Sequence, residues 1–133
     1  MIGLKTKGIL FLIGGLGYGL IEIIWRGYTH VSMLLAGGIC FNIFSFLGKR
    51  FTQKQWFKIF LMGSIAVTMV EFVFGVVFNI ILRKEVWDYS NMPLNILGQI
   101  CPLYSLFWGF LCLFFVPLAK KCEKRINIGL QNK

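Results

Sequence analysis

Two glutamates stand inside long apolar stretches of this 133-residue chain. Glu71 lies near the middle of the stretch 57–82, and Glu22 lies in the second half of the stretch 8–25. If these stretches cross a membrane, a charged side chain at the centre costs at least about 2.5 kcal/mol on insertion scales. We therefore expect both carboxyl groups to face protein or water, where they are candidates for binding a proton, a cation or a cationic solute.

Other polar and small residues surround these glutamates at helical spacing. In the third apolar stretch they recur every three or four residues, at Ser64, Thr68, Glu71, Gly75 and Asn79. Positions at this spacing share one face of a helix. The candidate substrate-binding residues are five from such faces, Tyr18, Glu22, Glu71, Asn79 and Gln99, and three from the loop before the fourth stretch, Trp87, Asp88 and Tyr89.

Each feature also has a structural interpretation. Glu22 and Arg26 are four residues apart, so they form either a local ion pair or part of a ligand site. Glu71 has no cation near it in its own stretch, where the basic residue is Lys58 at the start. It is either a protonated carboxyl hydrogen-bonded to Gln99, Asn42 or Tyr18, or a group that binds a proton or cation. The small residues favour close helix packing.

The elements that must position these residues follow from composition. Hydrophobic residues make up 57% of the chain and charged residues 14%, against about 25% charged in soluble domains. The apolar residues fall into four blocks, at 8–25, 31–48, 57–82 and 96–119. Each is near the ~20 residues that a helix needs to cross about 30 Å of hydrocarbon. Because lipid leaves no partner for open backbone groups and strand-like alternation is absent, we predict an all-α membrane protein, a single bundle of four transmembrane helices over 1–133.

Basic residues predict the orientation of the bundle. The N-terminal segment, the loop between the second and third blocks and the tail 120–133 would share one side, with 11 of the 14 Lys and Arg. The positive-inside rule then places both termini in the cytoplasm of a multi-pass protein of the cell membrane. The first block is expected to be retained rather than cleaved as a signal peptide. The charge is split among short segments beside the bilayer, which argues against nucleic-acid binding.

The segment before the fourth block reads as a helix start. Ser90 or Asn91 would cap the helix, Pro93 would occupy its first turn, and Asp88 would complement its dipole. Pro102 would then kink the fourth span. Residues 28–40 align without a gap with residues 89–101, matching Tyr, Gly, Ile and Cys. The hairpins of spans one–two and three–four are therefore predicted to be related.

Enzymatic and metal chemistry have little support. Cys40, Cys101, Cys112 and Cys122 form no C-x-x-C pair, and the chain has one histidine. No nucleophile stands beside a base in sequence, and no metal motif is present. We expect no cofactor, no metal, no disulfide and no enzymatic activity.

Several groups of residues together resemble one known family. They are Gly17 to Glu22, the spaced Thr68, Glu71, Gly75 and Asn79, the run Trp87 to Ser90, Pro93, Asn95, Gly98 to Cys101, and Trp108 with Gly109. This combination is similar to the CmpB-like family of putative ABC-transporter type IV membrane proteins. The second span departs from the family, with Leu34 to Cys40 in place of a Gly, Pro and Tyr-rich stretch. The resemblance implies a transport-related membrane protein, and because the chain lacks a phosphate-binding loop we expect it to bind no nucleotide.

Two functions compete at this stage. The first is a transport-related bundle with a buried polar site around Glu22 and Glu71, which would act as a homodimer because four spans are few for a carrier. The second is a non-catalytic accessory or scaffold subunit that docks another membrane subunit, and whose glutamates are structural. A lipid-processing enzyme ranks below both.

Overall fold

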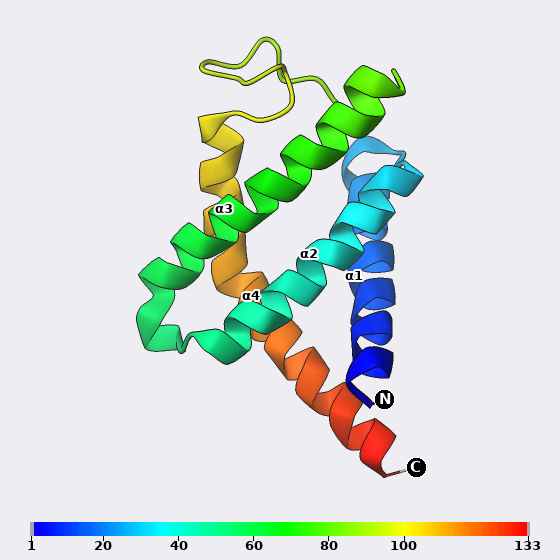
Figure 1. The fold of residues 1–133 in the computed structure, drawn as a ribbon, viewed down its shortest axis with the longest axis vertical. Helices are drawn as coiled ribbons and strands as arrows, with labels where there is room; N and C mark the ends of the chain where they lie inside the picture. Colours follow the sequence, from blue (N-terminus) through cyan, green and yellow to red (C-terminus); the bar gives the residue numbers. More distant parts are fainter. Residues whose placement is uncertain (1, 133) are drawn as a thin grey trace.

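Long apolar helices account for most of the fold, which a computed structural model describes for residues 2–132 (Figure 1). Helix α1 spans Ile2–Arg26 and α2 spans Val31–Arg50. A short 3₁₀ turn, η1, at Gln53–Gln55 leads into α3 at Trp56–Phe74, which continues as the π-helix η2 at Gly75–Ile81. Helix α4 spans Pro102–Gln131. The part of the chain that the structure describes has no regular strand and one isolated bridge, between Ile96 and Ile100.

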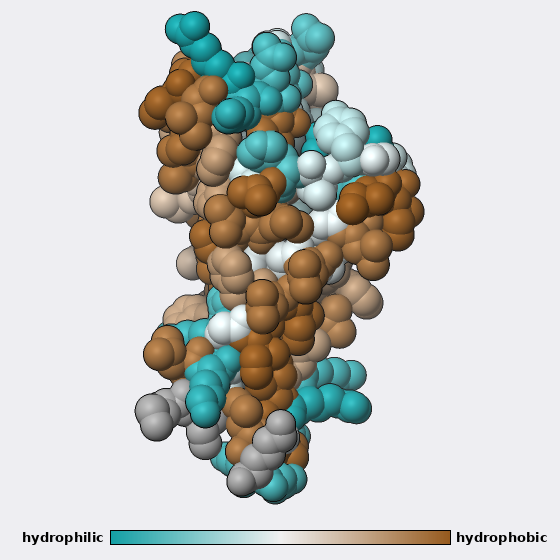
Figure 2. All heavy atoms as spheres, turned by 90° about the vertical axis from the view of Figure 1, so that its right-hand side faces the viewer, coloured by the Kyte–Doolittle hydropathy of each residue, from teal (hydrophilic) through white to brown (hydrophobic). Residues whose placement is uncertain are grey.

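The prediction of four membrane-spanning helices is confirmed. Four helical segments are long and apolar enough to cross a membrane: Gly3–Arg26, Val31–Arg50, Gln53–Ile81 and Pro102–Gln131. Figure 2 shows a broad apolar belt between two hydrophilic ends. Large apolar side chains on this belt are exposed, among them Leu16 and Phe114. Because such surface is stable only against lipid or another apolar partner, the chain is a multi-pass membrane protein.

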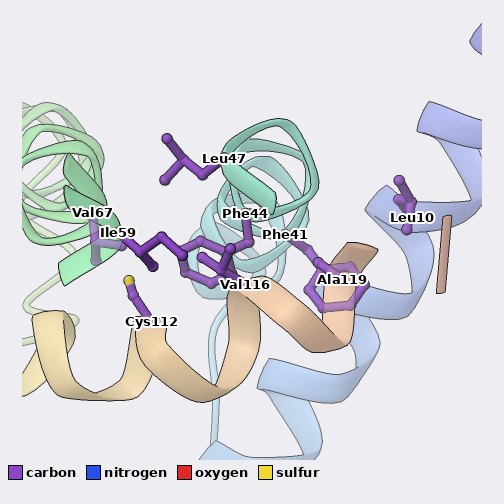
Figure 3. Close-up of a cluster of buried hydrophobic side chains, with 9 residues drawn as sticks. All are labelled: Leu10, Phe41, Phe44, Leu47, Ile59, Val67, Cys112, Val116 and Ala119. Carbon is purple, nitrogen blue, oxygen red and sulfur yellow. The ribbon is translucent and has the colours of Figure 1, made fainter. Parts of the chain in front are cut away.

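The buried core lies where α2, α3 and α4 meet. Figure 3 shows Phe44 of α2, Ile59 of α3 and Val116 of α4 gathered between these helices, with Leu10 of α1 to one side. Close approach depends on glycine. A Cβ added to Gly15 would lie 2.6 Å from the Leu34 carbonyl oxygen, so α1 and α2 pack backbone to backbone there.

The predicted start of the fourth helix at residue 96 is wrong. Residues 97–99 form a turn between the bridged residues Ile96 and Ile100, and α4 begins at Pro102. Leu94, Leu97 and Gly98 have left-handed backbone angles, with φ of 57°, 54° and 72°, so the chain cannot be a right-handed helix through this segment. Pro102 occupies the first turn, where its missing N–H is harmless, and it introduces no kink.

The predicted cap is wrong for the same reason. Ser90, Asn91 and Pro93 belong to the turns between η2 and α4 and do not start a helix. Cys101 precedes the helix instead, with an extended backbone and no side-chain cap. The Asp88 carboxylate accepts a hydrogen bond from the Ser90 backbone N–H at 2.9 Å, so it closes a turn of the loop.

The basic tail 120–133 is helical through Gln131 and packs on the bundle. Thr6 of α1 hydrogen-bonds to Asn127, and Ser45 of α2 to Glu123. The two termini lie at the same end of the molecule, hereafter the termini end (Figure 1). The two segments aligned as a repeat fold differently, since residues 31–40 are helical and residues 92–101 form turns. The kinship of the hairpins and the cytoplasmic placement of the termini stay predictions.

Candidate functional site

Glu71 lies where α3 meets α4 and the loop of residues 82–101, hereafter the α3–α4 loop. The Tyr89 hydroxyl donates a hydrogen bond to Glu71 Oε2 at 3.0 Å, and the Trp108 indole N–H donates to the same oxygen at 3.3 Å. The other oxygen, Oε1, is buried and has no hydrogen-bond partner among residues 2–132. One oxygen of this carboxyl group is therefore doubly satisfied and the other is left open.

Tyr18 of α1 lies against Trp108 of α4. Its ring centroid is 6.3 Å from that of Trp108, whose N–H binds Glu71. Tyr18 therefore reaches the surroundings of Glu71 from α1.

Glu22 is committed to an ion pair, as its spacing from Arg26 predicts. The Arg26 Nε lies 2.8 Å from Glu22 Oε2, off the line of its own N–H, while Nη2 donates a hydrogen bond to Oε1 at 3.1 Å. The Arg26 Nη1 also donates to the Val86 carbonyl at 3.1 Å. Glu22 is 7% exposed, so this contact neutralises a buried charge and joins α1 to the α3–α4 loop.

Asn79 and Gln99 anchor the α3–α4 loop on the π-helix. The Asn79 side-chain N–H donates to Gln99 Oε1 at 2.7 Å, and its oxygen accepts from the Val86 backbone N–H at 2.7 Å. A Cβ on Gly75 would lie 2.5 Å from Gln99 Oε1, so only glycine lets the loop sit this close. Gln99, predicted inside the fourth span, instead lies buried in the loop that folds back over η2.

An open cleft of about 840 Å³ lies between this loop and the end of α1. Its lining residues are Arg26, Tyr28, Asn79, Glu85, Val86, Trp87, Asp88, Tyr89, Asn91, Met92, Gln99 and Tyr104. The Trp87 indole N–H donates to the Gln99 carbonyl at 3.0 Å, and the Tyr89 and Tyr104 rings stack with centroids 4.7 Å apart. Tyr89 therefore borders the cleft with its ring and touches Glu71 with its hydroxyl.

Two titratable groups of the loop have shifted pKa values. The Ser90 backbone N–H holds the pKa of Asp88 below its usual range by hydrogen-bonding the carboxylate. Burial, together with the nearby Glu71 charge, raises the pKa of Tyr89 above its usual value. Tyr89 accordingly keeps its proton and acts as a hydrogen-bond donor to Glu71.

Sequence reasoning found most members of this constellation but not its contacts. The predicted partners of Glu71 are wrong: Gln99 binds Asn79, and Asn42 donates to the Lys7 and Gly38 carbonyls. Tyr89 and Trp108 bind Glu71 instead. Trp108 and Tyr104 were missed as site residues, although Trp108 lies three residues after Ser105 on the polar face of its helix.

The site offers hydrogen bonds and aromatic faces rather than metal ligands. Among the described residues, no three His, Cys, Asp or Glu side chains cluster so as to hold a metal ion. The four cysteines are free thiols.

Comparison with known proteins places the chain in a family. A family model described as putative ABC-transporter type IV matches residues 8–132, which covers most of the first span, nearly all of the rest of the chain and the α3–α4 loop. No curated protein and no solved structure matches the chain. Since the model covers nearly the whole sequence, the chain belongs to the putative ABC-transporter type IV family, the CmpB-like family that its motifs resemble.

Proposed function

We propose that this chain is a transport-related membrane protein that binds a proton, a small cation or a cationic solute at Glu71. The observation that carries the proposal is the open oxygen of that carboxyl group: Oε1 is buried and lacks a hydrogen-bond partner among residues 2–132. A buried ionised carboxylate requires a compensating charge. The ion pairs of the described chain involve Glu22 and Glu123, and neither contains Glu71.

A bound proton or cation meets this requirement. A proton on Oε1 removes the charge, while a cation beside Oε1 neutralises it in place. The two donors from Tyr89 and Trp108 both bind Oε2, so a ligand bound at the open oxygen competes with neither hydrogen bond. An intramembrane carboxylate that changes between neutral and compensated states is the chemistry of proton- and cation-coupled carriers.

The cleft supplies a route to Glu71. Glu85 and Asp88 line it with carboxylates that form no ion pair among the described residues, and the Arg26 charge is neutralised by Glu22. A cation is therefore drawn into the cleft, where Tyr89 is the side chain that separates it from Glu71. Movement of the Tyr89 ring would open the route.

The orientation of the protein in the membrane and its assembly are also proposed. The cleft faces the outside of the cell membrane and both termini face the cytoplasm, following the bias of basic residues. A homodimer or another membrane subunit completes the transport unit, because one chain offers four spans. The chain binds no nucleotide and has no enzymatic activity.

Proteoliposomes test the role of Glu71. Proton flux under an imposed potential is measured with an internal pH dye, and uptake of tetraphenylphosphonium is measured separately as a probe of organic cations. Glu71→Gln keeps the size of the side chain but removes the charge, and we expect it to abolish whichever flux the unmodified protein supports. Glu123→Gln makes the same chemical change at the termini end, outside the cleft, and should retain at least about half of it.

Failure has a clear form. Equal flux in Glu71→Gln and the unmodified protein, or no flux of either probe in both, contradicts the proposal. The second outcome favours an accessory or scaffold subunit.

A specific observation supports a structural role for one glutamate, since Glu22 is paired with Arg26, which also donates a hydrogen bond to the Val86 carbonyl. Recovery of a stable partner from native membranes by crosslinking would then identify what the chain supports.

A further inference from the structure

A second, smaller cleft lies at the termini end, away from Glu71. It has a volume of about 290 Å³ and is lined by Lys7, Leu10, Asn42, Ile43, Ser45, Phe46, Lys49 and Glu123. These residues come from α1, α2 and α4. We infer that this cleft binds the phosphate of an anionic phospholipid, with the lysines holding the headgroup and the apolar wall contacting the start of the acyl chains.

The depth of the cleft suits a lipid headgroup. Lys7 and Lys49 lie where the apolar parts of α1 and α2 end, and Figure 2 shows hydrophilic side chains gathering at this end below the apolar belt. A phospholipid places its phosphate at this boundary, between hydrocarbon and water. Lysine side chains near helix ends extend toward it.

The cleft walls are braced by polar contacts. The Asn42 side-chain N–H donates to the Lys7 carbonyl at 3.1 Å and so ties α2 to α1. Ser45 donates to Glu123, and Lys49 Nζ donates to Glu123 Oε1 at 2.9 Å, which ties α2 to α4. A cleft held on both sides by such contacts needs little reorganisation to bind a ligand.

The charge in the cleft favours an anion. Glu123 is the one carboxylate in the lining, and Lys49 and Ser45 already engage it. Among residues 2–132 the Lys7 ammonium acts on the Glu123 charge but forms no hydrogen bond or ion pair of its own. Two lysines and one glutamate leave a charge of +1, and Lys120 packs beside Gly48 on the neighbouring helix. The donors left over are those of Lys7 and the exposed side of Lys49.

The apolar side of the cleft distinguishes a lipid from a free anion. Phe46 stands at the cleft and is 62% exposed, while Leu10 is buried behind it and Ile43 is partly buried. An exposed phenylalanine beside lysines gives a free phosphate no favourable contact. It does contact the glycerol and acyl carbons of a lipid whose phosphate reaches Lys7.

Binding is tested on the purified protein in neutral detergent. Native mass spectrometry counts bound phosphatidylglycerol, and thermal unfolding is followed during titration with phosphatidylglycerol, phosphatidylcholine and inorganic phosphate. We expect phosphatidylglycerol to be retained and to raise the melting temperature, and the other two to have at most a weak effect. Lys7→Gln should weaken phosphatidylglycerol binding about fivefold, since a lysine near an anionic lipid surface contributes about that factor. Lys7→Arg should restore it.

Lys58→Gln is the matched control. Lys58 is an exposed lysine near the start of α3 and does not line this cleft. The same loss of charge there should leave phosphatidylglycerol binding unchanged. If Lys58→Gln weakens phosphatidylglycerol binding as much as Lys7→Gln, the lipid is attracted to basic residues in general and the inference is overturned. The inference is also overturned if phosphatidylcholine raises the melting temperature as much as phosphatidylglycerol. A full thermal shift with inorganic phosphate alone also overturns it, because the lipid's apolar part would then contribute nothing.

Discussion

Removal of one hydroxyl group gives the sharpest test of the Glu71 site. Tyr89→Phe deletes the donor that lies 3.0 Å from Glu71 Oε2 and leaves that oxygen with the longer bond from Trp108. A net hydrogen bond to a neutral group contributes about 1 kcal/mol to stability, and one to a charged group about 1.5–3 kcal/mol. With Oε1 already without a partner, we expect Tyr89→Phe to lower the free energy of unfolding by about 1–3 kcal/mol.

The measurement is reversible unfolding in mixed detergent micelles, followed by far-ultraviolet circular dichroism. Tyr104→Phe is the control, because it removes a hydroxyl from the ring that stacks on Tyr89 and that hydroxyl makes no hydrogen bond within the described chain. Its effect should stay within about 0.5 kcal/mol. If both variants lose the same stability, the hydroxyl contact to Glu71 contributes nothing and the reasoning about this site fails.

Three further outcomes follow from other contacts. Glu22→Gln should lower the free energy of unfolding by about 3 kcal/mol, because it leaves the Arg26 charge partly buried and uncompensated. The double variant Glu22→Gln/Arg26→Met should recover part of that loss. If the effects of the two single variants simply add in this double-mutant cycle, the ion pair is contradicted. Gly63→Ala should destabilise the protein by about 1–3 kcal/mol, since the new Cβ would lie 2.6 Å from the buried Cys112 thiol. In the control Gly17→Ala the new Cβ meets nothing within 4 Å, so this variant should be neutral or more stable. Equal free energies of unfolding for the two variants would refute the packing argument. The Asp88 carboxyl, followed by carbon NMR, should titrate with a pKa below its usual value. Its hydrogen bond therefore stabilises the fold fully at a pH above the usual pKa, and this stability is lost as the pH falls through the lowered pKa. A titration at the usual pKa would contradict the turn contact.

Much of the fold and part of the site could be predicted from local sequence. The four spans follow from apolar blocks of sufficient length, because lipid requires each backbone to satisfy its own hydrogen bonds. The Glu22–Arg26 pair follows from a separation of four residues, which a helix converts directly into contact. The start of α4 could not be predicted this way. Ile96 and Ile100 are apolar enough for a span, but they pair with each other in a loop containing left-handed residues.

The contacts of Glu71 required the tertiary structure. Tyr89 and Trp108 lie 18 and 37 residues from it along the chain, on a loop and on another helix, and no local spacing relates them. The contacts of the π-helix η2 are also between residues distant in sequence. Gln99 of the α3–α4 loop packs on Gly75 and accepts a hydrogen bond from Asn79.

The four spans and the two glutamates inside them follow from the sequence, because apolar length and helical periodicity are properties of short segments. The surroundings of Glu71, in contrast, depend on the tertiary structure. Glu22 is paired with Arg26 of its own helix, whereas the packing of α3 on α4 and Tyr89 leaves one oxygen of Glu71 open. The partners of Glu71 come from α4 and the α3–α4 loop, and packing of the whole fold decides which of their side chains reach it.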